Sequence, residues 1–210
     1  MKIKDLAVKV DAVLKKRYPD AKTSLDFSTP LELLVATILS AQCTDERVNM
    51  VTKTLFKKYR TAKDYAAAPI EKLEEDIRST GFYKNKAKSL KACSGDIVEK
   101  HGGKVPSTME ELTSLHGVGR KTANVVLGAA FGVPGVVVDT HVGRVSQRLG
   151  IAKEKTPEKI EIELMDSVPK KDWTGFSLRM IHFGREFCQA KKPRCGECPI
   201  YDLCGWEGKK

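Results

Sequence analysis

The chain has 210 residues and a formal net charge of +10. This length suits one or two compact domains with room for a substantial core, and the basic balance favours an anionic partner such as nucleic acid or a membrane surface. The basic residues are spread along the chain, which argues against a disordered basic tail. A generally basic protein without such a partner remains open on charge alone.

No segment has the sequence of a membrane span. The longest uncharged apolar stretch, residues 125–138, contains three glycines and a proline and is too short to cross a bilayer as a helix. Residues 1–20 carry Asp5 and Asp11 among their lysines and lack a continuous apolar core, so they predict an amphipathic helix and not a signal peptide. We therefore expect an intracellular, soluble protein without structural disulfides.

Helix signals recur along the whole chain. Thr29-Pro30-Leu31-Glu32 combines an N-cap, a proline at the first helical position and a capping-box glutamate, which predicts a helix to Leu39. Residues 107–110, Ser-Thr-Met-Glu, form a second capping box. Further helices are expected over residues 1–20, 45–59, 69–77 and 84–98, and from Lys121, Thr140, Thr156 and Asp172 onward.

Strand signals are nearly absent, since only Gly135 to Val138 has β character. The sequence therefore predicts an all-α protein of about ten helices. The Val133-Pro134-Gly135 break, which follows a run of apolar helices, predicts a boundary between two helical lobes.

The most distinctive segment is residues 115–123, LHGVGRKTA. Gly117 and Gly119, framed by a leucine and a valine, predict a tight turn that lets the main chain approach a ligand closely. The N–H groups of the turn and of the following helix start form a favourable phosphate site. Lys121 stands at this helix start, where its amine is a possible nucleophile. Asp139 follows eighteen residues later.

Four cysteines give a second strong signal. Cys188, Cys195, Cys198 and Cys204 follow the spacing C-x6-C-x2-C-x5-C. Four thiolates so close together in an intracellular chain indicate a metal site, and both zinc and a 4Fe–4S cluster accept four cysteines. The uneven spacing, with one CxxC pair, favours the cluster and leaves zinc as the alternative. Cys43 and Cys93 are expected in helices as small buried residues.

Together these motifs resemble the endonuclease III family of DNA glycosylases and abasic-site lyases, within the helix-hairpin-helix superfamily. The resemblance rests on the cysteine loop and on LSAQCTD at 39–45, TGFYKNKA at 80–87, LHGVGRKTANVV at 115–126 and VDTHVGRVSQRLG at 138–150. It covers nearly the whole chain in the family's order.

The resemblance implies a two-lobed fold. Residues 22–134 would form a six-helix barrel carrying the hairpin, and residues 1–21 with 135–210 a second helical lobe holding a 4Fe–4S cluster on the four cysteines. It also implies a cytoplasmic, nucleoid-associated protein of a prokaryotic cell that acts as a monomer on double-stranded DNA containing damaged pyrimidines or abasic sites.

The implied catalytic pair is Lys121 and Asp139. The lysine amine would attack the anomeric sugar carbon and form an imine, which permits β-elimination of the 3′ phosphate. Burial, the positive end of the helix and neighbouring Arg120 would favour the neutral amine. Asp139 would stabilise cationic character on the sugar and also cap its own helix.

The resemblance further implies a set of DNA contacts. Gln42 and Phe82 would fill the gap left by a flipped nucleotide, with Phe82 exposed in a loop before Lys84 and Lys86. The remaining contacts would be made by Gly117, Gly119, Arg120, Thr140, His141, Arg144, Lys191, Lys192 and Arg194.

Two positions depart from the family pattern. His116 stands where the family commonly has proline, and Gly143 replaces a bulkier residue. The first would loosen or re-aim the hairpin and the second would enlarge space beside the site. Two other classes of protein compete with the bifunctional enzyme: a monofunctional glycosylase that uses water, and a non-catalytic DNA-binding protein. The presence of both Lys121 and Asp139 argues against each.

Overall fold

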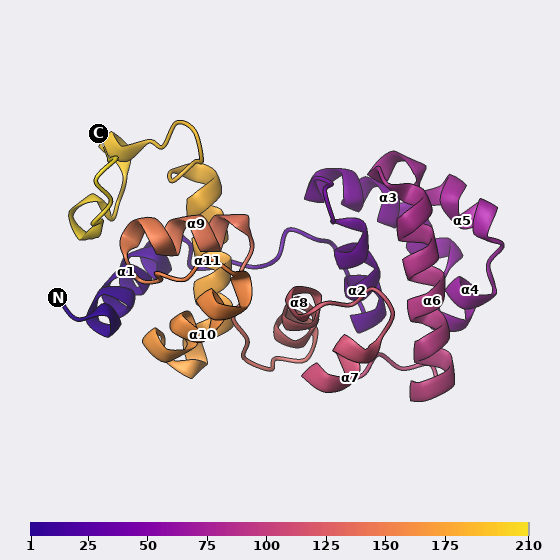
Figure 1. Ribbon diagram of the computed structural model, residues 1–210. Helices are drawn as coiled ribbons and strands as arrows, with labels where there is room; N and C mark the ends of the chain where they lie inside the picture. Colours follow the sequence, from indigo (N-terminus) through magenta and orange to yellow (C-terminus); the bar gives the residue numbers. More distant parts are fainter. Residues whose placement is uncertain (210) are drawn as a thin grey trace. The chain divides into compact units, whose positions relative to one another are not determined.

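The computed structural model describes residues 1–209, which form eleven α-helices, four short 3₁₀ helices and no strand. This confirms the all-α prediction. The chain divides into two compact units, one of Met1–Lys22 with Pro134–Lys210 and the other of Thr23–Val133 (Figure 1). None of the described helices is long and apolar enough to cross a bilayer.

The central unit is built on its longest helix. Its elements are α2 (Pro30–Leu39), α3 (Asp45–Lys58), α4 (Ala62–Ala67), α5 (Ile70–Ile77), the 3₁₀ helix η1 (Arg78–Thr80), α6 (Tyr83–His101), α7 (Met109–Ser114) and α8 (Arg120–Ala130). Helices α4 and α5 pack along α6, and α2 packs against α8 (Figure 1). Leu33, Leu73 and Leu90 are among the fully buried side chains of this core.

Most helix starts in this unit agree with the sequence prediction. The Thr29 hydroxyl accepts the Glu32 N–H at 3.2 Å, which confirms the predicted N-cap, but the Glu32 carboxylate accepts the Ser28 N–H and not that of Thr29. The second box is shifted by one residue, because Thr108 caps α7 and accepts the Glu111 N–H at 3.3 Å. Helix α4 was not predicted, although Thr61 and Asp64 form a capping box at its start.

The other unit joins the two ends of the chain. It contains α1 (Ile3–Arg17), α9 (Thr140–Leu149), α10 (Pro157–Ser167), α11 (Trp173–Glu186) and the 3₁₀ helices η2 (Lys170–Asp172), η3 (Cys195–Glu197) and η4 (Tyr201–Leu203). Helix α1 packs on α10 and α11. Buried Arg179 donates from Nε to Asp11 Oδ1 at 2.8 Å, and Lys15 bridges Asp11 and Asp172 at 3.0 and 2.7 Å.

The β character of residues 135–138 produces no strand, in agreement with the all-α prediction. The segment is buried but pairs with no strand among the described residues. Its polar backbone is satisfied by side chains of α11 instead. The Val137 N–H donates to Ser177 Oγ at 3.0 Å, and the Gly135 N–H to Thr174 Oγ1 at 3.3 Å. Valine favours extended backbone, but a strand also needs a partner.

Gly143 is not needed for its conformational freedom. A Cβ there would lie 3.7 Å from Ile160 Cδ1 and 3.9 Å from Val138 Cγ1, which is ordinary contact. A glycine inside a helix costs about 0.5–1 kcal/mol relative to alanine. We therefore expect Gly143→Ala to raise the thermal midpoint by roughly 2 °C, measured by circular dichroism.

Gly184→Ala is the matched comparison, because its Cβ would lie 3.0 Å from His141 Cβ and 3.3 Å from Val145 Cγ2. Helices α9 and α11 would have to separate, so this variant should lose about 1–3 kcal/mol of stability. Equal effects of the two substitutions would contradict the packing described.

Candidate functional site

Helices α7 and α8 form a helix–hairpin–helix. Leu115 and Val118 are buried at either side of the turn, and the Val118 N–H donates to the Leu115 carbonyl at 3.1 Å. Gly117 has φ +74°, and a Cβ there would lie 3.2 Å from the Ser89 side chain of α6. Glycine is therefore required at 117 for both conformation and space. Gly119 has φ −89°, which other residues also adopt, so a left-handed backbone requires glycine only at 117.

The start of α8 is open. Gly119 is its N-cap and supplies no side-chain hydrogen bond, which leaves this end of the helix suited to an anion. Arg120 and Lys121 occupy its first turn, and both are exposed. The expected burial of Lys121 is therefore wrong for the free protein.

A hydrogen bond to α6 anchors the entry to the hairpin. The backbone N–H of His116 donates to Asp96 Oδ2 at 2.8 Å, and Lys100 Nζ lies 2.6 Å from Asp96 Oδ1. The Lys100 ammonium and the His116 N–H together hold the pKa of the Asp96 carboxyl below its usual value. The departure from proline at 116 thus supplies a donor that proline lacks.

Two exposed residues of this unit have a strained backbone. Gln42 has φ 52° and Phe82 has φ 49°, and they are the non-glycine residues with positive φ in the described chain. Such conformations persist where the surrounding structure imposes them, and they cluster at functional sites. The Phe82 side chain is 64% exposed, which confirms the predicted exposure.

Gln42 and Phe82 line the same pocket. It encloses about 710 Å³ of space free of protein atoms. Its lining comes from α2 and the loop after it, from α6 with Phe82 just before it, and from the hairpin: Thr37, Ile38, Ala41, Gln42, Phe82, Asn85, Lys86, Ser89, Gly117 and Thr122. The structure therefore brings both predicted gap-filling residues together with the hairpin glycine.

Lys86 differs from its neighbour Lys84, which is exposed. Its side chain is buried, and burial lowers its pKa. The sequence does not mark Lys86 as buried, because a lysine one turn into a helix such as α6 is usually solvated.

Asp139 is the N-cap of α9, as predicted. Its Oδ1 accepts the N–H groups of His141 and Val142, both at 2.8 Å, and its Oδ2 lies 3.1 Å from His141 Nδ1. These contacts hold the carboxylate in one orientation. His141 is half-buried beside it, and Thr140 is exposed at the first helical position.

The remaining basic candidates fall into two groups. Arg144 donates from Nε to the Cys188 carbonyl and from Nη2 to the Gly184 carbonyl, both at 3.0 Å, so it anchors the cysteine loop to α11. Lys191 and Lys192 are exposed on that loop. Arg194 is also exposed, where it pairs with Glu197.

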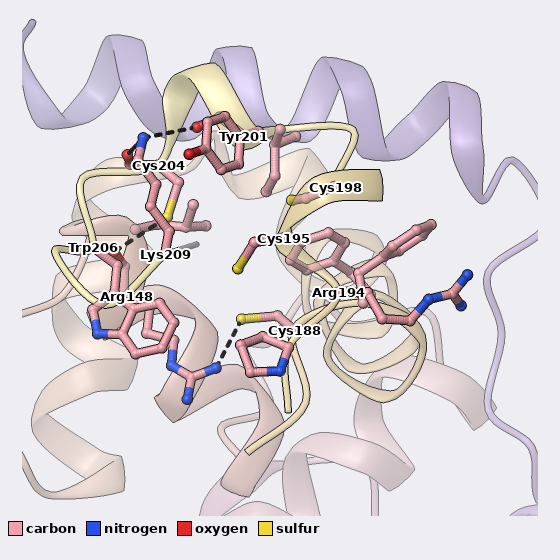
Figure 2. A pocket seen from close by; sticks show the side chains of 14 residues that line it. Arg148, Cys188, Arg194, Cys195, Cys198, Tyr201, Cys204, Trp206 and Lys209 are labelled. Atoms are coloured by element: carbon pink, nitrogen blue, oxygen red, sulfur yellow. Dashed lines mark hydrogen bonds between the residues drawn. The ribbon is translucent and has the colours of Figure 1, made fainter. Parts of the chain in front are cut away.

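The four cysteines of residues 188–204 line one cavity (Figure 2). Their sulfur atoms are directed into it. In a 4Fe–4S cluster each thiolate binds a different iron, so the sulfurs need to surround a cavity. Apolar walls formed by Leu149, Phe183 and Ile200 complete it. The residues present therefore fit a cluster.

Three basic residues border the same cavity: Arg148, Arg194 and Lys209. Arg148 donates from Nη1 to Cys188 Sγ at 3.3 Å and to the Gln189 carbonyl at 2.8 Å, and its guanidinium lies 4.0 Å from the Trp206 ring centroid. A cluster bound by four thiolates is dianionic, and these cations offset that charge. Burial raises the pKa of the Cys198 thiol, whereas ligation to iron stabilises the thiolate.

Two further findings concern the cysteines. Among residues 1–209, no three His, Cys, Asp or Glu side chains surround a single metal-ion position. Cys93 is buried in α6, as predicted, and burial raises the pKa of its thiol to about 12. Cys43 is half-buried but lies in the loop before α3, so its predicted helical position is wrong.

Fold and site together define a helix-hairpin-helix protein of base-excision DNA repair with an iron–sulfur loop. The model of the HhH-GPD superfamily of base excision DNA repair proteins matches residues 35–170, and that of the iron–sulfur binding domain of endonuclease III matches residues 188–204.

Individual relatives give the same result. Endonuclease III of Synechocystis is 54% identical, over 96% of this chain and 92% of that protein, and endonuclease III of Bacillus subtilis is 54% identical, over 92% and 88%. A solved trapped endonuclease III–DNA covalent intermediate superposes with a TM-score of 0.92 at 48% identity, covering 98% of this chain and 96% of that one. The chain belongs to the endonuclease III family, and its cofactor is a 4Fe–4S cluster.

His116→Pro tests the hairpin anchor. Leu115 is already extended, as a residue before proline must be. The lost bond to a carboxylate is worth about 1.5–3 kcal/mol and the stiffer unfolded chain returns about 0.4–1 kcal/mol. We expect a net loss of about 1 kcal/mol in urea denaturation at pH 7.

The stabilisation that the His116–Asp96 hydrogen bond provides depends on pH. Because the pKa of Asp96 is depressed in the folded protein, the bond stabilises above the unfolded pKa near 4 and is lost as the pH falls through the folded value. Adding Asp96→Asn to the His116→Pro variant should cause little further loss of stability. Fully additive losses would contradict a shared bond.

Cluster removal is expected to release the cysteine loop. The purified protein should be brown with about four iron atoms per chain, and stoichiometric zinc in a colourless protein would contradict this. After oxidative removal of the iron, trypsin should cut after exposed Lys191 and Arg194, whereas the Lys192–Pro193 bond resists trypsin. The matched measurement is cutting of the holoprotein at the same two sites, which should be slower.

Proposed function

We propose that this protein excises oxidised pyrimidines from double-stranded DNA and then nicks the strand 3′ to the abasic site, with Lys121 as nucleophile. It is a DNA glycosylase and abasic-site lyase of base-excision repair. The observation that carries the residue assignment is the open start of α8. An exposed lysine stands there after the Gly117 turn, and its neighbour Thr122 lines the same pocket as Gln42 and Phe82.

The chemistry follows from the amine. Lys121 Nζ forms a bond to the anomeric carbon, and the base leaves with the electron pair of the glycosidic bond and a proton. Ring opening gives an imine, which acidifies the neighbouring C–H. Loss of that proton breaks the bond to the 3′ oxygen, and water then releases the lysine. The exposed amine needs DNA to cover it, because bound DNA supplies the desolvation that the free protein lacks.

Asp139 is proposed as the carboxylate that stabilises cationic character on the sugar and assists proton movement. Its Oδ1 is occupied by two backbone N–H groups, so Oδ2, on the His141 side, is the oxygen available for this task. Fixing one oxygen by capping removes rotational freedom from the other and preorganises it for developing charge.

DNA is held by groups that differ in task. The backbone at Gly117 and Gly119, the Arg120 side chain, and Thr140 with His141 are proposed to bind phosphates. Gln42 and Phe82 are proposed to enter the duplex where the damaged nucleotide leaves. Lys191, Lys192 and Arg194 extend the basic surface on the cysteine loop. Arg144 is assigned to anchoring that loop, because its guanidinium binds backbone carbonyls.

The cluster is proposed to hold the loop that carries these cations, a structural task. The protein is further proposed to act as a monomer on the DNA of the bacterial nucleoid. The relatives that support a bacterial setting are the endonuclease III proteins of Synechocystis and Bacillus subtilis.

Borohydride trapping tests the mechanism. Hydride reduces the imine to a stable amine, so wild-type protein should form a covalent complex with DNA containing an oxidised pyrimidine. Lys121→Gln should reduce trapping to background, whereas Lys53→Gln, an exposed lysine of α3, should trap normally.

The other outcomes separate the competing classes. Base excision without any adduct would favour a monofunctional glycosylase that uses water. Binding without excision would favour a non-catalytic DNA-binding protein. Normal trapping by Lys121→Gln would assign the nucleophile elsewhere.

A further inference from the structure

Lys86 connects the two loops that carry Gln42 and Phe82. Its side chain is only 5% exposed, and its ammonium donates to the carbonyls of Leu39 and Thr80, both at 2.8 Å. Leu39 is the last residue of α2, three positions before Gln42, and Thr80 is the last residue of η1, two positions before Phe82. One side chain thus bonds both loops at their origins.

The backbone of Lys86 also contacts Phe82. Its N–H donates to the Phe82 carbonyl at 3.1 Å, in the first turn of α6. Lys86 therefore bonds the chain on both sides of Gly81, whose φ is +71°, and holds the left-handed residue Phe82 between two hydrogen bonds. Left-handed backbone at a bulky residue persists only where neighbouring contacts enforce it.

The Lys86 ammonium lies at helix ends, where a positive charge is stabilised. Carbonyls at the ends of helices lack partners within the helix and carry partial negative charge, so a cation there is stabilised. A buried ammonium without such partners would be strongly unfavourable. Removal of Lys86 takes the ammonium away from the carbonyls of Leu39 and Thr80. We therefore expect the loss of Lys86 to affect the two loops that follow these residues.

We propose that Lys86 is a positioning residue for DNA insertion: it holds Gln42 and Phe82 on one pocket so that both enter the duplex together. The inference rests on the proposed function of those two side chains. Lys86 does not touch the reacting atoms in this scheme. It acts through the two loops and matters only where a gap in a duplex must be filled.

The chain offers a matched control on the same helix. Lys91 of α6 is half-buried and donates to two carbonyls, those of Ala66 at 2.7 Å and Ala68 at 2.6 Å, at the end of α4. It makes the same kind of contact as Lys86 but holds neither insertion loop. Lys91→Met therefore removes an equivalent interaction without the proposed effect.

The test compares two substrates of the holoenzyme. On a duplex with an oxidised pyrimidine the gap must be filled, whereas on a single-stranded abasic oligonucleotide there is no gap. We expect Lys86→Met to lower single-turnover excision on the duplex at least tenfold and to leave single-strand lyase activity within twofold of wild type. Lys91→Met should leave both activities within twofold.

Epistasis gives a second readout. In a Gln42→Ala/Phe82→Ala background there is nothing left to position, so adding Lys86→Met should cost less than a further twofold on the duplex. Lys86→Arg retains charge and donors and should recover most of the duplex activity lost in Lys86→Met. If Lys86→Met does not fold by circular dichroism, Lys86→Arg is tested alone, and any loss it shows should be confined to the duplex.

Two results would overturn the inference: an equal loss on both substrates, or an undiminished effect of Lys86→Met in the double-alanine background. Full duplex activity of folded Lys86→Met would do the same. Failure of the proposed function is distinct, because it would show as absence of borohydride trapping by the wild-type protein.

Discussion

A chain of many short helices must satisfy the backbone groups at every helix end, and this constraint shapes both units. Threonine and aspartate oxygens accept the first N–H groups of five helices, at Thr29, Thr44, Thr61, Thr108 and Asp139. Basic side chains serve carbonyls between elements: Lys86 binds the ends of α2 and η1, and Arg144 binds Gly184 and Cys188. Much of the positive charge therefore has a structural task before any ligand arrives.

Six of the described α-helices have no side-chain cap, and two of them begin at the proposed active surface. Gly119 begins α8 and Phe82 begins α6. An uncapped N-terminus presents donors to a phosphate, while a left-handed Phe82 points an apolar ring outward. Neighbouring side chains stabilise these two helix starts. Lys86 binds the Thr80 carbonyl before α6, and Asp96 accepts the His116 N–H in the hairpin before α8.

The unit that carries the cysteines depends on contacts across the whole sequence. Asp11 near one end pairs with Arg179 near the other, and Tyr18 donates to Glu186 Oε2 at 2.7 Å. These contacts fix α11, whose end leads into the cysteine loop. Arg148 then ties that loop to α9 through the Gln189 and Ala190 carbonyls. The position of the cysteine loop therefore depends on a series of contacts that begins at α1.

Local chemistry let the sequence alone determine the helical class, the Thr29 cap, the hairpin framed by Leu115 and Val118, and the close grouping of four cysteines. Each of these depends on residues close together in the chain. Helix α4 was missed although its capping box is local. Only the tertiary structure decided that Lys86 is buried and Lys121 exposed, that residues 135–138 are not a strand, and that Asp11 meets Arg179. These outcomes depend on which surfaces pack together, and a linear pattern does not contain that information.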